Sequence, residues 1–110
     1  MALVPSVVHG RVAVVNVKDI DWIEADGDYA RIHAAKQWHV LRETMRSLEE
    51  QLDPARFARI HRSTIVNVER IKELQPYFRG DYVVILHDGT SLTLSRGYRP
   101  RLEEALGKPF

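Results

Sequence analysis

The sequence predicts a mainly β protein: small antiparallel sheets stacked in a compact single domain, with one short inserted helix and a C-terminal helix. Two observations lead to this fold class. Short runs of β-branched and aromatic residues recur with turn-forming residues between them, and helices do not alternate with these runs as a parallel sheet requires. At 110 residues, 45% of them hydrophobic, the chain is long enough to bury one core.

The first 11 residues are predicted to be a linker or a cloning remnant, and residues 12–110 the folded domain. The run over residues 11–17 is rich in β-branched residues and predicts a short strand that is covered on both faces. A second strand is expected over residues 20–25, ended by the turn-forming residues 26–28.

The clearest alternation in the chain covers residues 29–34. Tyr29, Arg31 and His33 fall on one face of a strand, and the small apolar residues between them fall on the other face, which we expect to meet the core. Residues 35–37 are predicted to turn into a strand over residues 38–42, which completes a hairpin.

Two short helices are expected. Thr44 is suited to an N-cap, and Met45 begins a series of apolar residues at helical spacing that ends before Pro54. The second helix is expected to begin near Arg99, because Pro100 cannot lie deep inside a helix but is tolerated in its first turn.

Residues 57–67 are predicted to form one extended strand with a polar tip. The tip consists of His61, Arg62 and Ser63, which are costly to bury together and are therefore expected to face water or a polar partner. A turn over residues 68–70 and a strand over residues 71–77 are expected to follow.

The best-defined hairpin covers residues 82–94. Its dipeptide Asp88-Gly89 is typical of a two-residue type I′ turn between strands. With that turn, the apolar cross-strand pairs are Ile85 with Leu92 and Val83 with Leu94.

Five histidines raise the question of a metal site. None forms an i, i+4 helical pair, and the acidic residues near them do not complete a ligand set, so we expect no metal and no cofactor. His33 and His39 are expected to form at most a surface pair across their hairpin. The chain has no cysteine, which excludes disulfides and thiolate metal sites.

Catalysis is not expected either. His61 and Ser63 are the nearest approach to a catalytic pair, but no glycine-rich nucleophile elbow surrounds the serine and no orienting carboxylate lies close in the sequence. A phosphate-binding glycine loop is also missing from the sequence. We therefore predict a binding domain rather than an enzyme.

The sequence gives no sign of a membrane or secreted protein. No apolar run approaches the roughly 20 residues of a membrane-spanning helix. The apolar opening of the chain stops at Pro5 and lacks the basic start of a signal peptide. We expect a cytoplasmic domain.

The positive charge consists mainly of arginine. Net charge is only +1, but twelve of the sixteen cationic residues are Arg, and eight of these lie between Arg56 and Arg101. Arginine can contact phosphates and guanine edges in a bidentate way that lysine cannot reproduce. Arginine with serine, histidine and tyrosine at strand ends suits DNA binding, although unrelated surface residues would give the same composition.

Three blocks of the sequence resemble the LytTR DNA-binding domain. They are residues 22–29 (WIEADGDY), 56–67 (RFARIHRSTIVN) and 92–96 (LTLSR). The resemblance runs from about Val12 to Leu106, with the blocks in the family's order and at its separations. The second block is the most specific of the three.

The resemblance implies a fold and a function. LytTR domains are compact stacks of small antiparallel sheets at the output end of bacterial two-component response regulators, behind a phosphoacceptor receiver domain. They insert loops, rather than a recognition helix, into successive major grooves of bent DNA. The implied partners are promoter DNA with tandem half-sites and an upstream receiver domain or sensor kinase; we expect a monomer in the absence of DNA.

By position, the resemblance places DNA contacts in the loop before Tyr29 and at Tyr29 itself, at Arg62, and at the corner formed by residues 95–97. His61 and Ser63 fall at phosphate or at the base of the tip, and Asn67 is expected to tie down the following turn. The complete predicted DNA-binding set is Tyr29, Arg31, His61, Arg62, Ser63, Arg96 and Arg99.

The chain departs from the family pattern at two positions. Asp28 stands where the family often has Asn, and a carboxylate near phosphates is unfavourable unless it is paired or accepts from a cytosine amino group. Gly97 stands where a second basic residue is common, which shifts the expected contact at that corner towards Arg99.

Two other functions stay open at the level of the sequence. One is a β-barrel module that binds an anionic nucleotide messenger through Arg96, Arg99 and Arg101. The other is a protein-interaction domain that uses the face carrying Tyr29, Arg31 and His33.

Overall fold

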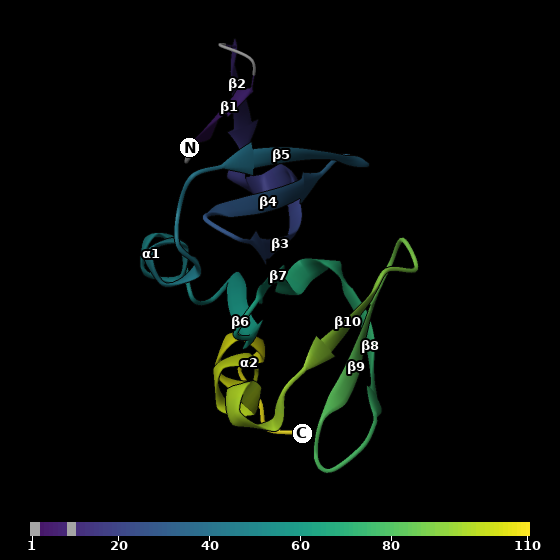
Figure 1. Ribbon diagram of the computed structural model, residues 1–110. Helices are drawn as coiled ribbons and strands as arrows, with labels where there is room; N and C mark the ends of the chain where they lie inside the picture. The colour runs from purple at the N-terminus through teal and green to yellow at the C-terminus, as the bar shows by residue number, and fades with distance from the viewer. Residues whose placement is uncertain (1–2, 9–10) are drawn as a thin grey trace.

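A computed structural model describes residues 3–8 and 11–110, and the side chains from residue 12 onward (Figure 1). The strands are β1 (Leu3–Val8), β2 (Arg11–Asn16), β3 (Ile20–Asp26), β4 (Tyr29–Ala34), β5 (Gln37–Leu41), β6 (Phe57–His61), β7 (Thr64–Asn67), β8 (Ile71–Pro76), β9 (Tyr82–Leu86) and β10 (Ser91–Leu94). The α-helices are α1 (Met45–Gln51) and α2 (Arg99–Leu106), and the 3-10 helices are η1 (Val17–Asp19), η2 (Val68–Arg70) and η3 (Arg96–Tyr98).

These strands form three sheets. A two-stranded sheet pairs β1 with β2, a five-stranded sheet has the order β5-β4-β3-β7-β6, and a three-stranded sheet has the order β10-β9-β8. Neighbouring strands are antiparallel in all three. Figure 1 shows the sheets stacked along the molecule, with β1 and β2 at one extreme and α2 near the other. The predicted fold class is confirmed.

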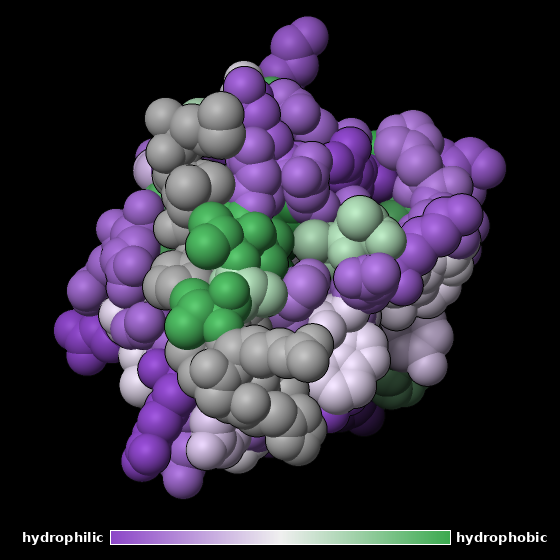
Figure 2. Space-filling model, turned by 90° about the horizontal axis from the view of Figure 1, so that it is seen from above, coloured by the Kyte–Doolittle hydropathy of each residue, from purple (hydrophilic) through white to green (hydrophobic). Residues whose placement is uncertain are grey.

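The N-terminal residues differ from the sequence prediction in part. The segment expected to be a linker contains strand β1 (Leu3–Val8), which pairs with β2 in a register that places Val4 opposite Val15. The division of the chain at residue 12 stays a prediction, and residues 1–2 and 9–10 lie outside the described residues. Val12 and Val14 of β2 are exposed, and Figure 2 shows hydrophobic residues gathered on this side of the molecule.

Both helices lie where the sequence predicts them. The Thr44 Oγ1 caps α1 by accepting a hydrogen bond from the Ser47 N–H at 3.0 Å. Pro100 occupies the first turn of α2, and Gly107 ends this helix with a φ of 79°, a left-handed conformation that glycine adopts without steric cost.

The alternation over β4 is confirmed. Ala30, Ile32 and Ala34 are buried in the core, whereas Tyr29 and its neighbours on the other face are more exposed. The expected pairing of the two histidines across β4 and β5 is wrong, because Ile32 lies opposite His39.

The prediction of one extended strand over residues 57–67 is wrong. The segment is a hairpin of β6 and β7 that turns at Arg62 and Ser63. The Ser63 N–H donates to His61 Nδ1 at 3.1 Å, and the Arg59 guanidinium donates to the Arg62 carbonyl at 2.6 Å. Such side-chain hydrogen bonds offer the backbone an alternative to continued strand pairing.

The β6–β7 hairpin lies between the two hydrophobic cores of the described residues. Phe57 and Ile65 belong to one core, with α1 and the inner face of β3 and β4. Ile60 and Val66 belong to the other, which includes the three-stranded sheet and α2. Because consecutive strand residues point to opposite faces, this short hairpin can serve both cores at once.

The register predicted for the hairpin of β9 and β10 is wrong by one residue. Leu92 lies opposite Val84 and Leu94 opposite Tyr82, because the turn has three residues, His87-Asp88-Gly89. Gly89 has a φ of 91°, which suits a type I turn followed by a left-handed glycine. The shift places Val84, Leu86, Leu92 and Leu94 together in the second core.

Candidate nucleic-acid interface

Three turns lie together at one end of the strands, where β3, β6 and β10 finish. They are residues 27–28 between β3 and β4, residues 62–63 between β6 and β7, and residues 95–97 after β10. The Ala25 N–H donates to the Ser63 carbonyl at 2.9 Å, and the Ser95 N–H donates to the Ile60 carbonyl at 2.9 Å. These main-chain bonds join the three turns, and we call this end of the molecule the turn end.

The central turn is held firmly while its arginine stays outward. The Arg59 guanidinium donates to the carbonyls of His61 at 3.3 Å and of Arg62 at 2.6 Å. The same guanidinium lies 3.4 Å from the Glu49 carboxylate of α1. The Arg62 side chain is exposed and has no ion pair or hydrogen bond among the described residues.

His61 and Ser63 shape this turn. The His61 Nδ1 accepts from the Ser63 backbone N–H at 3.1 Å, and its distance to the Ser63 Oγ is 2.8 Å. An Nδ1 that accepts a hydrogen bond carries no proton. Both side chains are partly buried at the base of the turn, where they orient it.

The first turn combines an aromatic side chain with charges of both signs. Tyr29 is 46% exposed and lines a cleft of about 520 Å³ with Asp28, Arg42 and Glu43. Arg42 lines the same cleft as Asp28, the position where this chain departs from the family pattern. The sequence interpretation missed Arg42, although its position at the end of the predicted strand over residues 38–42 placed it beside the start of β4.

The third turn is fixed by the neighbouring β8–β9 loop. The Arg96 N–H donates to the Asp81 Oδ1 at 3.0 Å, so the carboxylate is used by the backbone and the guanidinium remains exposed. Tyr29, Arg62 and Arg96 therefore all belong to the turn end, as the predicted interface requires.

The turn end differs from the rest of the surface because it holds the arginines that lack an acidic partner. Among the arginines whose side chains are described, those without an ion pair are Arg42, Arg62, Arg79 and Arg96. Each lies in or next to a turn at the turn end, because β5 ends there and the β8–β9 loop contacts Arg96. Cationic groups that are not neutralised within the protein are available to an anionic partner.

Two residues of the predicted DNA-binding set are paired instead. Arg31 lies 2.8 Å from Asp26 and 3.5 Å from Glu24, with its guanidinium over the Trp38 ring. Arg99 lies 3.5 Å from Glu103, and its guanidinium stacks on Tyr82 and Phe110.

The cluster proposed for a nucleotide messenger does not form. Arg99 is held by Glu103, whereas the Arg101 Nε lies 2.9 Å from Glu49, so these arginines have different partners and do not converge with Arg96.

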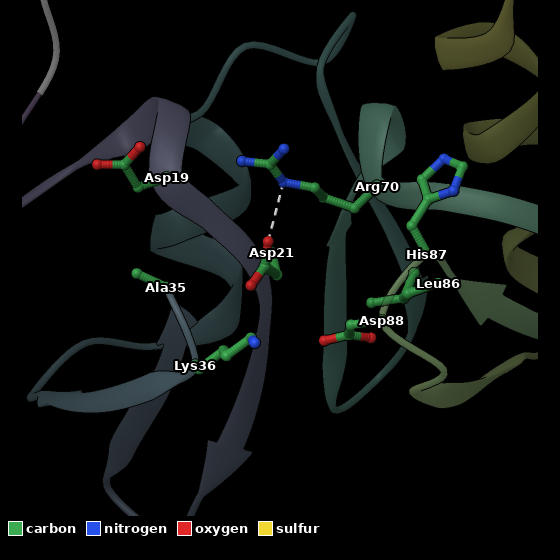
Figure 3. A pocket seen from close by; sticks show the side chains of 8 residues that line it. All are labelled: Asp19, Asp21, Ala35, Lys36, Arg70, Leu86, His87 and Asp88. Carbon is green, nitrogen blue, oxygen red and sulfur yellow. Dashed lines mark ion pairs between the residues drawn. The ribbon is translucent and has the colours of Figure 1, made fainter.

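The opposite end of the sheets carries a cleft of a different character. Its volume is about 310 Å³, and Figure 3 shows Arg70 reaching across it to Asp21, where the Arg70 Nε lies 2.9 Å from Oδ1. Burial raises the pKa of the Asp21 carboxyl above its ordinary value, although the Arg70 guanidinium opposes this shift. The backbone N–H of Thr90 donates to Asp88 and lowers the pKa of that carboxyl.

The described side chains provide no group of three or more residues that could hold a metal ion. None of the helices in the described ranges is long and apolar enough to cross a membrane. The architecture is that of a stacked antiparallel β domain that presents joined turns with unpaired arginines.

The comparisons with known proteins identify the family. The model of the LytTr DNA-binding domain family matches residues 10–107, and the chain belongs to this family. The sensory transduction protein LytT of Bacillus subtilis is 32% identical over 95 residues, which cover 86% of this chain and 39% of LytT. The transcriptional regulatory protein LytR of Staphylococcus aureus is 29% identical over 103 residues, which cover 94% of this chain and 42% of LytR.

A solved structure has the same fold. The LytTr DNA-binding domain of a methyl-accepting/DNA response regulator from Bacillus cereus superposes with a TM-score of 0.87, at 22% identity and with 97% of this chain and 98% of that chain covered. The chain spans only about two fifths of the length of LytT and LytR.

Proposed function

We propose that this LytTR domain reads the sequence of double-stranded DNA with its turn end, as the output domain of a bacterial transcriptional regulator. In this proposal Arg62 contacts base edges in a major groove, and Tyr29 and Arg96 contact DNA from the neighbouring turns. His61 and Ser63 position the central turn. Because Arg31 and Arg99 have acidic partners, we expect smaller contributions from these two arginines.

One observation supports this proposal above all others. The unpaired arginines gather at the turn end although the net charge of the chain is only +1. Phosphate contacts and bidentate contacts to guanine both need guanidinium groups that are not already neutralised. A surface used only to solvate the fold gives no reason for this distribution.

Several properties of the whole regulator belong to the same proposal. We infer that a receiver domain or a sensor kinase controls the domain, and that the protein acts in the cytoplasm. The names of the relatives support a regulatory output. We further infer that the domain acts by binding alone, without catalysis, and that single copies in solution bind tandem half-sites about one helical turn apart.

The experiment is a selection followed by a titration. Duplexes that bind the domain are enriched from a random pool, and the affinity of the winning sequence and of a scrambled sequence is measured by fluorescence anisotropy at two salt concentrations. We expect the selected duplex to bind roughly 10³-fold more tightly than the scrambled one, with affinity falling steeply as salt rises. Equal affinity for both duplexes, or no binding at low salt, contradicts the proposal.

Two controls address the other candidate functions. A calorimetric titration with cyclic nucleotides should give no heat, whereas a messenger-binding module would give a saturable signal. Size-exclusion chromatography should show the domain co-eluting with the selected duplex, which a module that binds only proteins would not do.

A further inference from the structure

The loop between β8 and β9, residues 77–81, carries two of the most exposed hydrophobic side chains among the described residues. Tyr77 is 70% exposed and Phe78 is 64% exposed. Adjacent aromatic residues at this exposure leave apolar area in water without contributing to the core. The hydrophobic cores described above include neither of them.

The loop holds these side chains outward by its own backbone structure. The Tyr77 N–H donates to the Asp81 carbonyl at 2.9 Å, and the Asp81 N–H donates to the Phe78 carbonyl at 3.1 Å. Arg79 has a φ of 55°, which is unusual for a residue with a side chain and has an energetic cost. The loop is therefore a defined turn, and its aromatic residues are not exposed by fraying.

Arg79 adds a cation to the same surface. Its guanidinium lies 5.1 Å from the centroid of the Phe78 ring, and no acidic residue pairs with it among the described side chains. Arginine beside an exposed aromatic ring combines a phosphate-binding group with an apolar surface suited to sugars and bases.

The loop is continuous with the third turn of the turn end. The Asp81 carboxylate accepts the Arg96 N–H at 3.0 Å. A Cβ placed on Gly80 would lie 3.5 Å from the Arg96 Cβ, so the loop backbone and the Arg96 side chain are already in close contact. Any duplex that reaches Arg96 must approach the 77–81 loop as well.

We propose that the 77–81 loop is a fourth DNA-contacting element, which binds the sugar–phosphate backbone next to the groove that Arg96 enters. Arg79 pairs with a phosphate, and Phe78 packs on the adjoining deoxyribose. The proposal rests on the proposed function and extends it. The loop adds affinity and lengthens the contact with the DNA backbone, but it does not read base sequence.

The test uses Arg79→Gln and Phe78→Ala, with Lys36→Gln as the matched control. Lys36 also lies in a turn with a positive φ, 63°, and is exposed, but its turn joins β4 to β5 at the opposite end. The DNA is the selected duplex in two lengths, the minimal site and the site extended by about 10 base pairs on each side, or one helical turn. Thermal unfolding verifies that each variant folds.

On the extended duplex we expect Arg79→Gln and Phe78→Ala to weaken binding roughly 3- to 10-fold, while Lys36→Gln stays within about twofold of the original chain. Arg79→Gln should lower the slope of log affinity against log salt by about 1, and base preference should be unchanged in both variants. The affinity difference should shrink on the minimal duplex.

Loop variants that bind the extended duplex with the original affinity and salt slope overturn the proposal but leave the proposed function intact. A change in self-association without a change in DNA affinity also overturns it, since the loop would then contact a second copy of the chain. If the original chain binds no duplex, the proposed function fails and this extension fails with it.

Discussion

The two ends of the sheets differ in how they use the same residue types. At the turn end, four arginines, Arg42, Arg62, Arg79 and Arg96, have no ion pair among the described side chains. At the opposite end, Arg70 is paired with Asp21, and Asp19 and Asp88 line the same cleft. The near-zero net charge therefore hides a difference between the two ends, which arises because arginine is paired with an acidic residue at one end and not at the other. Composition is a poor guide to the binding surface of a small domain, and the partner of each arginine is a better one.

The functional difference between the two ends is tested most directly by removing one arginine from each end. Arg62→Ala should weaken binding to the selected duplex by ~1–3 kcal/mol and relax base preference at one position, because the base contact proposed for this exposed arginine is lost. Its effect on the free energy of unfolding should stay within about 0.5 kcal/mol.

The matched change at the opposite end is Arg70→Ala, with the reverse expectation. It should lower the free energy of unfolding by roughly 1 kcal/mol, because Asp21 and the Lys18 carbonyl both lose their partner, while DNA affinity stays unchanged. Anisotropy and chemical denaturation measure the two quantities. Equal losses of affinity from both variants would show that the two ends are not functionally distinct.

A smaller effect is expected from the residue that supports the central turn. Arg59→Lys keeps the charge but cannot donate to both carbonyls of the turn in the same fork geometry, so binding should weaken by about 1 kcal/mol. Base preference should relax at the position that Arg62 is proposed to contact, which a general loss of stability would not produce.

Arg101→Lys is the control for Arg59→Lys, because Arg101 also pairs with Glu49 but donates to no carbonyl of the turn. It should leave the base preference intact. Selection experiments with both variants measure this preference. If Arg59→Lys and the original chain have the same base preference, Arg59 does not contribute to recognition.

The smallest effect concerns pH at the opposite end. Because the pKa of Asp21 is raised in the folded state, ionising this carboxyl destabilises the fold as pH rises above the ordinary value of 3.8. Asp21→Asn removes that cost, so its stability relative to the original chain should increase with pH across this range, by less than about 1 kcal/mol.

Thermal unfolding from pH 3 to pH 7 measures the trend for Asp21→Asn. The DNA affinity of this variant at neutral pH should equal that of the original chain. A stability difference that falls with increasing pH would mean that the Arg70 ion pair outweighs the effect of burial.

Local signals in the sequence predicted most of the elements, and non-local contacts account for the errors. Thr44 and Pro100 act on their own helices, so both helices could be placed. The turn at residues 62–63 lacks glycine, proline and asparagine and depends on an arginine that α1 helps to hold in place. No short-range rule contains that contact.

The register of the last hairpin failed for a different reason. Asp88-Gly89 is compatible with both a two-residue and a three-residue turn, and only the burial of Val84 with Leu92 distinguishes them.

The ion pairs of two predicted site residues could have been predicted from the sequence. Arg99 and Glu103 have the i, i+4 spacing of a helical ion pair, and the hairpin turn at residues 27–28 places Glu24 opposite Arg31. The 77–81 loop could not be assigned in this way, because its place beside Arg96 comes from tertiary contacts.

The main-chain hydrogen bonds from Ala25 to Ser63 and from Ser95 to Ile60 have a consequence for evolution. Backbone groups make these bonds, so side chains at positions 28, 62 and 96 can be exchanged without changing the distances between the turns. If these turns contact DNA as proposed, a lineage of such domains can acquire new target sequences one contact at a time, while the spacing between the contacts is inherited unchanged. Under that proposal, relatives should differ in the DNA sequence that each turn contacts and agree in the distance between the contacts.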